Sequence, residues 1–157
     1  MLKIMKLSLL AEYPNLIEEV AKWYYNEWAK DVPNVTVDHI INNLSKAQNV
    51  DKIPLLVVAH KEKEFVGAAE LKFRENKNYL EYEHWIGGVF VKPEFRGQGI
   101  SKALIKEVKQ HSKRLKVQKL YLQCKSKYKE LYSKFGFIEI HKENKNGIKK
   151  SIMVCAI

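Results

Sequence analysis

The sequence predicts a single α/β domain in which helices flank a mixed, mostly antiparallel sheet. Two observations favour this fold class. Short apolar segments with strand character alternate with amphipathic helical segments, and the 157 residues contain no repeat, low-complexity tract or linker. A chain of this length can bury a sizeable core as one unit. We therefore expect residues 1–157 to form one domain.

The N-terminal half is expected to form one strand followed by two helices. Residues Lys3–Leu9 alternate apolar and polar side chains, as a strand does. Pro14 suits the first position of a helix that ends near Lys30. Thr36 is a suitable N-cap for a second helix over Val37–Ala47. The apolar residues of the first helix recur at helical spacing, which predicts a place in the core for Leu16, Ile17, Val20, Ala21, Tyr24 and Trp28.

The C-terminal half is expected to supply the rest of the sheet and two more helices. The turns at Lys61–Glu64 and Asn144–Gly147 are short enough to close hairpins, and Gly136 suits the end of a short helix. The predicted strands are Pro54–Ala59, Phe65–Phe73, Tyr82–Val91, Leu120–Cys124, Phe137–Ile140 and Ser151–Cys155, and the predicted helices are Ser101–Leu115 and Tyr128–Phe135.

The composition is that of a globular protein with a basic surface. Hydrophobic residues make up 46% of the chain, charged residues 29%, and the net charge is +10. This charge attracts anions, but the lysines are spread along the chain without interleaved aromatic residues, so no specific nucleic-acid partner is expected. No apolar segment approaches the ~20 residues that span a membrane, and no signal peptide is apparent. Cys124 and Cys155 suggest reduced, buried thiols, and we expect a cytoplasmic protein without a metal site.

The most informative segment is Val91–Leu104, which carries the chain from a strand through a glycine-rich turn into a helix. Backbone N–H groups at a helix start lack intrahelical partners and lie at the positive end of the helix dipole, so they bind phosphate well. Gly97 and Gly99 let the backbone approach an anion, Arg96 adds a charge, and Ser101 adds a hydroxyl. The turn has neither the third glycine of a dinucleotide fingerprint nor the Gly-Lys-Ser/Thr of a P-loop. A simple helix-capping turn is the alternative.

The pattern Val-x-Pro-x-x-Arg-Gly-x-Gly-Ile in this segment resembles the acetyl-CoA signature of the GNAT family of N-acetyltransferases. The order of predicted elements is also similar to that family over nearly the whole chain. The resemblance implies an acyl-CoA N-acyltransferase-like fold with acetyl-CoA as co-substrate. It implies that the CoA pyrophosphate binds a loop formed by Arg96, Gly97, Gln98, Gly99, Ile100 and Ser101, and that pantetheine pairs with the main chain of Val89, Phe90 and Val91.

The strand before the loop contains a glycine pair that bears on pantetheine binding. Gly87 and Gly88 could form a bulge that opens the edge of this strand, or they could simply relieve packing. A family asparagine that lies near CoA is replaced in this chain within Cys124–Lys127, where Ser126 or a backbone group would have to substitute.

Catalytic roles fall on two residues. Leu131–Phe137 resembles the family's Leu-Tyr-x-Lys-x-Gly-Phe segment, which implies that Tyr132 protonates the CoA thiolate; a packing role beside Phe135 is the alternative. Glu83 is the first choice for the general base because it shares strand parity with residues leading to the thioester. The unperturbed pKa of a histidine suits a base near neutrality better, but His84 has the opposite parity, and a mechanism in which water takes the proton is a further alternative.

The predicted function is transfer of the acetyl group of acetyl-CoA to a primary amine of a small molecule or peptide by direct attack. The alternatives are a non-catalytic acyl-CoA-binding regulatory module and a basic nucleic-acid binder. In the family, the first two helices help to build the acceptor site, where Trp23 and Tyr25 could border a groove. The basic charge disfavours polycationic acceptors, although a local acidic pocket would overturn this. A homodimer is one option for the assembly.

Overall fold

The computed structural model describes residues 4–157, which form one seven-stranded sheet with the order β1-β2-β3-β4-β5-β7-β6. Neighbouring strands are antiparallel except β4 and β5, so the sheet is mixed and mostly antiparallel, as the sequence predicts. The strands are β1 (Met5–Leu9), β2 (Leu55–Lys61), β3 (Glu64–Phe73), β4 (His84–Val91), β5 (Lys119–Lys125), β6 (Ile138–Lys145) and β7 (Ile148–Ala156). The α-helices are α1 (Ile17–Tyr24), α2 (Val37–Ser45), α3 (Ile100–Arg114) and α4 (Lys129–Ser133).

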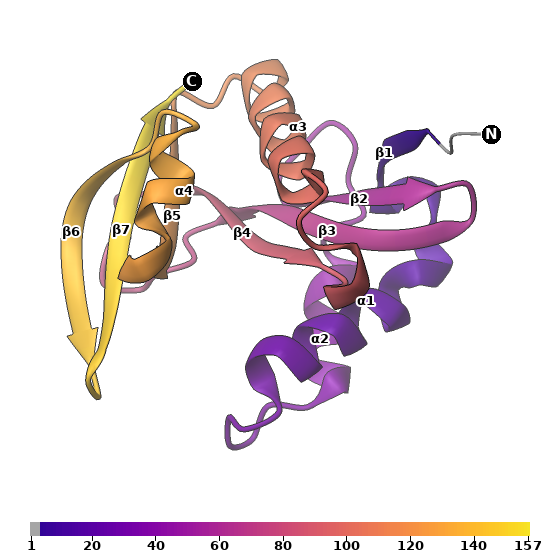
Figure 1. The fold of residues 1–157 in the computed structure, drawn as a ribbon, viewed down its shortest axis with the longest axis horizontal. Helices are drawn as coiled ribbons and strands as arrows, with labels where there is room; N and C mark the ends of the chain where they lie inside the picture. The colour runs from indigo at the N-terminus through magenta and orange to yellow at the C-terminus, as the bar shows by residue number, and fades with distance from the viewer. Residues whose placement is uncertain (1–3) are drawn as a thin grey trace.

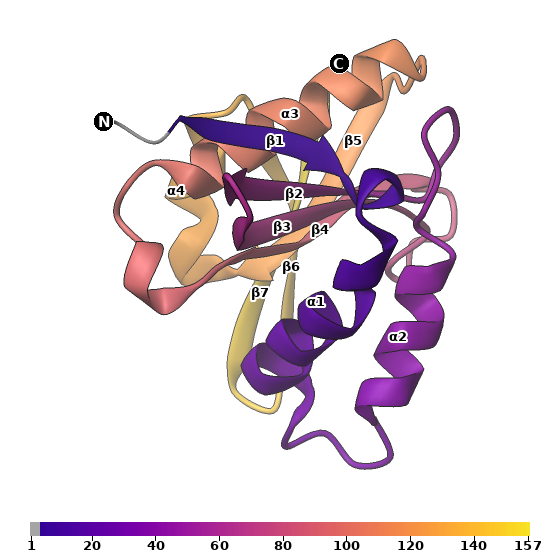
Figure 2. The same ribbon diagram turned by 90° about the vertical axis from the view of Figure 1, so that its right-hand side faces the viewer.

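Helices cover both faces of the sheet (Figures 1 and 2). Helix α3 packs on one face through Leu104, Ile105 and Val108, which join a core of side chains from β2, β3, β4, β5 and β7. Helices α1 and α2 cover the other face, where Val20 and Leu44 contact side chains of β2, β3 and β4. Because successive strand residues point to opposite faces, the alternation along β3 sends Ala69 and Leu71 toward α3 and Glu70 toward α1.

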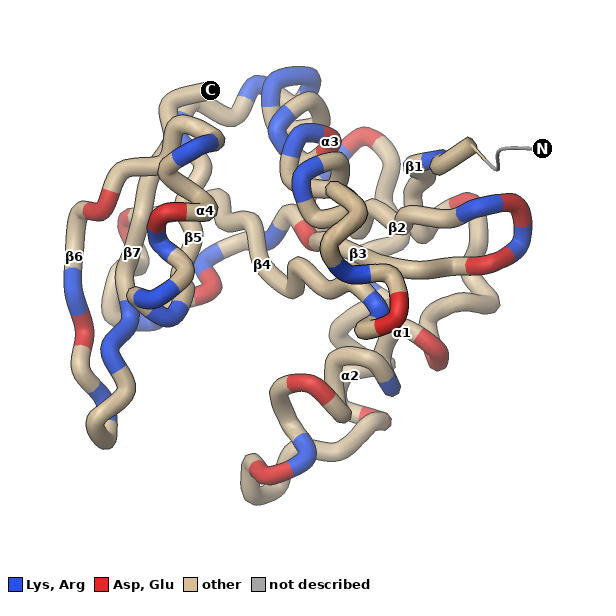
Figure 3. The backbone as a smooth tube through the Cα atoms, viewed as in Figure 1, with Lys and Arg blue, Asp and Glu red and all other residues tan. Residues whose placement is uncertain are grey.

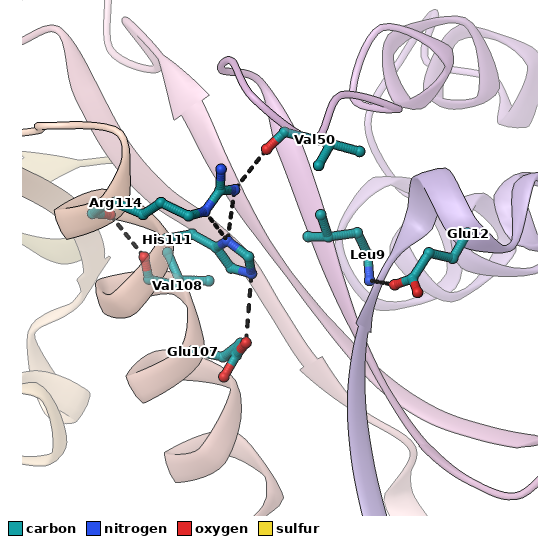
Figure 4. A network of polar contacts seen from close by, with 8 residues as sticks. Leu9, Glu12, Val50, Glu107, Val108, His111 and Arg114 are labelled. Carbon is teal, nitrogen blue, oxygen red and sulfur yellow. Dashed lines mark hydrogen bonds and ion pairs between the residues drawn. The ribbon is translucent and has the colours of Figure 1, made fainter.

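Polar contacts fix the C-terminal end of α3 beside the segment that follows α2 (Figure 4). The Arg114 guanidinium donates to the Val50 carbonyl at 2.6 Å and lies 2.9 Å from His111 Nδ1. His111 Nε2 is 3.5 Å from a carboxylate oxygen of Glu107, one turn earlier. These contacts lie far along α3 from the glycine loop, so they support the helix without entering the loop.

The predicted helix over Pro14–Lys30 forms, but it changes character in its last turns. After α1, residues Tyr25–Ala29 form a π-helical turn. The wider turn inserts an extra residue, which rotates the following side chains relative to regular helical spacing. The prediction that Trp28 is a core residue is therefore wrong, since Trp28 is 51% exposed and Ala29 takes the inward position.

The other predicted elements form with shifts of a few residues at their ends. The Thr36 hydroxyl accepts from the His39 N–H at 3.2 Å and caps α2, as predicted. Gly136 ends the α4 segment at a φ of 88°, and Asn146 and Gly147 close the β6–β7 hairpin with φ values of 54° and 80°. Lys3, the first residue of the predicted N-terminal strand, lies outside the described residues.

Charges are distributed unevenly over these elements (Figure 3). Helix α3 carries five lysine and arginine residues and a single acidic residue, whereas the helical segments on the opposite face of the sheet carry several carboxylates. In the part of the chain that the structure describes, no helix is long and apolar enough to cross a membrane.

Candidate active site

The glycine loop joins β4 to α3 and presents N–H groups at the helix start. Gly97 and Gly99 have φ values of 80° and 82°, where side chains with a Cβ are disfavoured. A Cβ on either glycine would meet no atom within 4 Å, so the space in front of the loop is open. The Ala103 N–H donates to the Gly99 carbonyl at 3.1 Å, which leaves the preceding N–H groups without acceptors inside the helix. This arrangement suits a phosphate or pyrophosphate.

The side chains of Arg96 and Ile100 are held against the protein and do not project from the loop. Arg96 Nε donates to the Val91 carbonyl at 2.8 Å, and its guanidinium lies 5.6 Å from the centre of the Phe90 ring. Arg96 also pairs with Glu27 at 3.5 Å, so it folds back over the end of β4 instead of projecting freely from the rim of the loop. Ile100 is buried in the core under α3. Ile100 can therefore contact an anion only through its backbone N–H, and not through its side chain.

A second cation near the loop comes from a distant part of the chain. Lys61 Nζ lies 3.5 Å from Gln98 Oε1 and 5.8 Å from the centre of the Phe95 ring. Sequence reasoning missed Lys61 because it lies at the β2–β3 turn, more than thirty residues before the loop. Only the folded hairpin brings it there, and nothing in the local sequence marks it.

Strand β4 has a bulge and an open edge directly before the loop. Ala68 of β3 pairs with Phe90, but Glu70 pairs with Gly87, so β4 holds one extra residue between these pairs. Gly88 lies in this bulge with a φ of 57°. On the other side, the pairing with β5 is limited to Trp85 and Tyr121, and the two strands then diverge. Of the two readings of the glycine pair, the bulge is the one that the structure supports.

This open edge belongs to Val89, Phe90 and Val91. Phe90 and Val91 are buried through their side chains, and Val89 is partly buried. Beyond Trp85, no described residue pairs with the β5-facing edge of β4, which leaves its backbone groups available. An extended ligand could add to this edge as a further strand.

Tyr132 lies on α4, the short helix after β5, and its ring packs edge-to-face on Phe137 at 6.3 Å. Burial, with smaller contributions from Cys124 and Tyr128, raises the pKa of Tyr132 to about 12. Burial, followed by the charge of Glu139, raises the pKa of the Cys124 thiol to about 11. At neutral pH both groups therefore carry their protons, and neither is a nucleophile in the free protein.

Glu83 lies just before β4, at the end of the strand farthest from the loop. Its side chain is 53% exposed and pairs with Arg74 at 3.7 Å. Its backbone carbonyl accepts from the N–H of Arg74, the residue that follows β3, at 2.8 Å. The structure thus places a half-exposed Glu83 at the end of β4 opposite the glycine loop.

A cluster of ionisable side chains that sequence reasoning missed lies against the bulge. Glu70 and Lys72 project from β3 toward α1, and Glu75 follows in the next loop. Lys72 Nζ is 3.0 Å from Glu75 Oε1 and 3.9 Å from Glu70 Oε2. Tyr24 of α1 is only 6% exposed. The hydroxyl of Tyr24 and Oε2 of Glu75 have no hydrogen-bond partner. Burial, with the charge of Glu75 adding to it and Lys72 opposing it, raises the pKa of Glu70.

Comparison with known proteins identifies the family. A family model described as an acetyltransferase (GNAT) domain matches residues 25–157. The chain belongs to the GNAT acetyltransferase family. No curated protein sequence matches it.

Solved structures of GNAT proteins share this fold. A GNAT-family acetyltransferase from Streptococcus pneumoniae is 15% identical, with a TM-score of 0.75 over 98% of this chain and 99% of that one. A putative acetyltransferase from Acinetobacter baylyi is 17% identical, with a TM-score of 0.76 over 100% and 95%. A putative acetyltransferase from Salmonella typhimurium, solved with its cofactor acetyl-CoA, is 15% identical, with a TM-score of 0.75 over 98% and 94%. The predicted acyl-CoA N-acyltransferase-like fold is confirmed.

One departure from the GNAT pattern also has a structural outcome. Ser126 stands near the position of the family's asparagine, and its hydroxyl lies 2.9 Å from the hydroxyl of Ser151 on β7. The hydroxyl of Ser151 in turn donates to Glu139. Ser126 is therefore engaged with the β6–β7 hairpin.

Proposed function

We propose that this GNAT chain is an acetyl-CoA-dependent N-acetyltransferase and that residues 1–157 act as one domain. In this reaction a primary amine of a small molecule or peptide attacks acetyl-CoA directly. One observation carries the proposal: an open helix start with backbone N–H groups that lack intrahelical acceptors directly follows a bulged strand whose edge is unpaired. The Salmonella structure with acetyl-CoA, which shares the fold, supports the choice of co-substrate.

The loop and strand would hold acetyl-CoA in two parts. The pyrophosphate accepts hydrogen bonds from the loop formed by Arg96, Gly97, Gln98, Gly99, Ile100 and Ser101, and Lys61 adds a positive charge nearby. The pantetheine arm pairs with the main chain of Val89, Phe90 and Val91. A backbone N–H beside the bulge then polarises the thioester carbonyl, as an oxyanion hole does.

The chemistry requires two proton movements. The amine must lose a proton before its lone pair attacks the carbonyl carbon and forms the C–N bond. The C–S bond then breaks, and the leaving thiolate takes the proton of Tyr132. Glu83 is the base that the sequence predicts, although its carboxylate is exposed and paired with Arg74.

Two measurements test this function. Calorimetric titration with acetyl-CoA should show saturable binding that weakens in Gly99→Val, because a β-branched residue is strained at a φ of 82°. CoA-thiol release should then be measured with amino acids, polyamines, aminoglycosides and peptide N-termini. Amine-dependent release supports the enzyme. Binding without release for any amine favours the non-catalytic acyl-CoA module, and tight binding of nucleic acid without preference for CoA favours the nucleic-acid binder.

A further inference from the structure

Two oxygen atoms converge on one point beside the bulge of β4. The position that a Cβ on Gly88 would occupy lies 2.7 Å from Glu70 Oε2 and 2.8 Å from the Tyr24 hydroxyl. Gly88 also has a φ of 57°. Glycine therefore allows both side chains to approach the backbone here. A Cβ on the neighbouring Gly87 would lie 2.9 Å from Glu75 Oε1 and 3.0 Å from its Oε2, so Glu75 borders the same stretch of strand.

This notch is polar but incompletely hydrogen-bonded within the described chain. The Tyr24 hydroxyl has no hydrogen-bond partner, although Tyr24 is only 6% exposed. Glu75 Oε2 has no partner either. A buried polar atom without a hydrogen bond is destabilising, so two such atoms on neighbouring residues of the bulge, the Tyr24 hydroxyl beside Gly88 and the Glu75 carboxylate beside Gly87, indicate a site for a donor.

The notch matches an ammonium group in charge and in hydrogen bonding. Two carboxylates and one lysine leave one negative charge to be balanced. A primary ammonium has three donors, and Tyr24 Oη, Glu70 Oε2 and Glu75 Oε2 offer three acceptors. The side chains of Glu70 and Glu75 are 12% and 18% exposed, so a ligand would reach the notch from the side of these two carboxylates. The exposed Trp28 ring lies 5.3 Å from Tyr24 and borders this region.

We propose that Tyr24, Glu70 and Glu75 bind the ammonium group of the acceptor beside the bulge, and that Glu70 removes its proton. This inference rests on the proposed acetyl transfer and replaces Glu83 as the base. An N–H bond of the ammonium breaks, its electrons stay on nitrogen, and the proton passes to Glu70 Oε2. The freed lone pair attacks the thioester carbonyl carbon, and the thiolate leaves with the proton of Tyr132. Glu70 returns its proton to solvent.

The surroundings of Glu70 suit this step better than those of Glu83. The charged and titratable groups that face Glu70 are Tyr24 from α1, Lys72 from its own strand and Glu75 from the following loop. Burial raises the pKa of Glu70, and the same desolvation lowers the pKa of an ammonium docked there, so proton transfer between them becomes easier. Glu83 is 53% exposed and paired with the Arg74 guanidinium, so an ammonium docked beside it would keep its contact with water.

Steady-state kinetics with the fastest acceptor separate the two bases. Glu70→Gln should lower kcat by about 100-fold or more, keep the KM for acetyl-CoA within about twofold, and remove the acidic limb of the kcat profile. Glu64→Gln is the matched control on β3, since Glu64 is exposed at the start of the same strand, and it should change kcat less than twofold. A large loss in Glu83→Gln with little change in Glu70→Gln would overturn the inference.

Tyr24→Phe combines a kinetic readout with a measurement of stability. Removing an unpartnered buried hydroxyl without changing the ring should raise Tm by a few degrees, while the KM for the amine rises about tenfold. A purely structural hydroxyl would change stability without changing that KM, and this result would contradict the inference. The same variant also guards against loss of folding in Glu70→Gln.

Binding of simple cations distinguishes failure of the site from failure of the proposed enzyme. Methylammonium chloride has three N–H donors, whereas tetramethylammonium chloride has the same charge and none. Methylammonium should raise the Tm of the wild-type protein above the value in tetramethylammonium at equal concentration, and Glu70→Gln should abolish the difference. If this difference is seen but no amine is acetylated, the site stands and the proposed function fails. If acetylation is seen without the difference, the inferred site fails.

Discussion

Tyr132 has a half-buried ring and a phenol whose pKa is raised to about 12. The direction of this shift keeps the phenol protonated at every pH below that value, so each molecule can donate a hydrogen bond to a leaving thiolate. A thiol has a lower pKa, ~8.5 for cysteine, so Tyr132 in the free protein is the weaker acid. In the proposed reaction, the hydrogen bond from Tyr132 to the departing sulfur strengthens as negative charge develops there, and the proton passes to the thiolate as the C–S bond breaks.

Tyr132→Phe should lower kcat by about 100-fold and leave the KM for acetyl-CoA within about threefold, because only the group next to the sulfur is lost. In the wild type, kcat should show no basic limb from Tyr132 until the pH approaches 12. Steady-state CoA-release assays across pH measure both. Tyr128→Phe is the matched control, since Tyr128 lies one turn earlier and is 49% exposed. An equal loss of kcat in the two variants would contradict the role of Tyr132.

Cys124 lies in the same region, and its raised pKa makes a further prediction. With a pKa of about 11, less than about one thiol in a thousand is ionised at pH 7.5. Alkylation of Cys124 by iodoacetamide at this pH should therefore be far slower than that of a free cysteine, as followed by peptide mass spectrometry. Reaction at the rate of a free thiol would show that the thiol is not held in its protonated form.

Sequence patterns identify residues by local context, which explains what was missed at this scale. The glycine loop and Tyr132 stand in contiguous motifs, so the sequence alone points to both. Tyr24, Glu70 and Glu75 come from a helix, a strand and a loop, and only the fold and the glycine backbone of β4 bring them together. Glu83 was chosen by strand parity, but the strand begins after it, so parity does not govern its side chain.

At the scale of elements, the bulge in β4 joins the open edge for acetyl-CoA to the carboxylate cluster. Gly88→Ala should destabilise the protein by about 2–4 kcal/mol, because backbone strain at positive φ adds to crowding against Tyr24 and Glu70. Gly147→Ala is the matched control, since its φ is 80° and a Cβ there meets no atom within 4 Å. That variant should cost only about 1 kcal/mol. Urea denaturation measures both, and equal costs would argue against crowding at the bulge.

Elements with strong periodicity were predictable, and departures from regular geometry were not. The hairpins, the Thr36 cap and the long helix α3 follow from alternation, capping and helical spacing. The π-helical turn at Tyr25–Ala29 has no such signature, so the prediction for Trp28 failed. The divergence of β4 from β5 beyond the Trp85–Tyr121 pair arises only in the assembled sheet, which a strand pattern does not encode.

At the scale of the whole molecule, the charge of +10 and the basic helix α3 should attract anionic acetyl-CoA. Raising the KCl concentration from about 0.05 M to about 0.5 M should raise the KM for acetyl-CoA several-fold and change kcat little, because salt screens long-range attraction. Acetyl-dephospho-CoA is the matched control, since it lacks one phosphate and should show a weaker salt dependence. A KM for acetyl-CoA that does not change with salt would show that the field plays no part in binding.

In the proposed reaction, the acetyl group passes from acetyl-CoA straight to an amine. A single-turnover reaction, with enzyme in excess over acetyl-CoA and analysed by mass spectrometry, tests this most directly. Without an amine, the enzyme mass should stay unchanged. With the best acceptor, one acetyl group should appear on the amine nitrogen as CoA-thiol is released. An enzyme that becomes acetylated before the amine is added, and then passes that group on, would contradict direct attack.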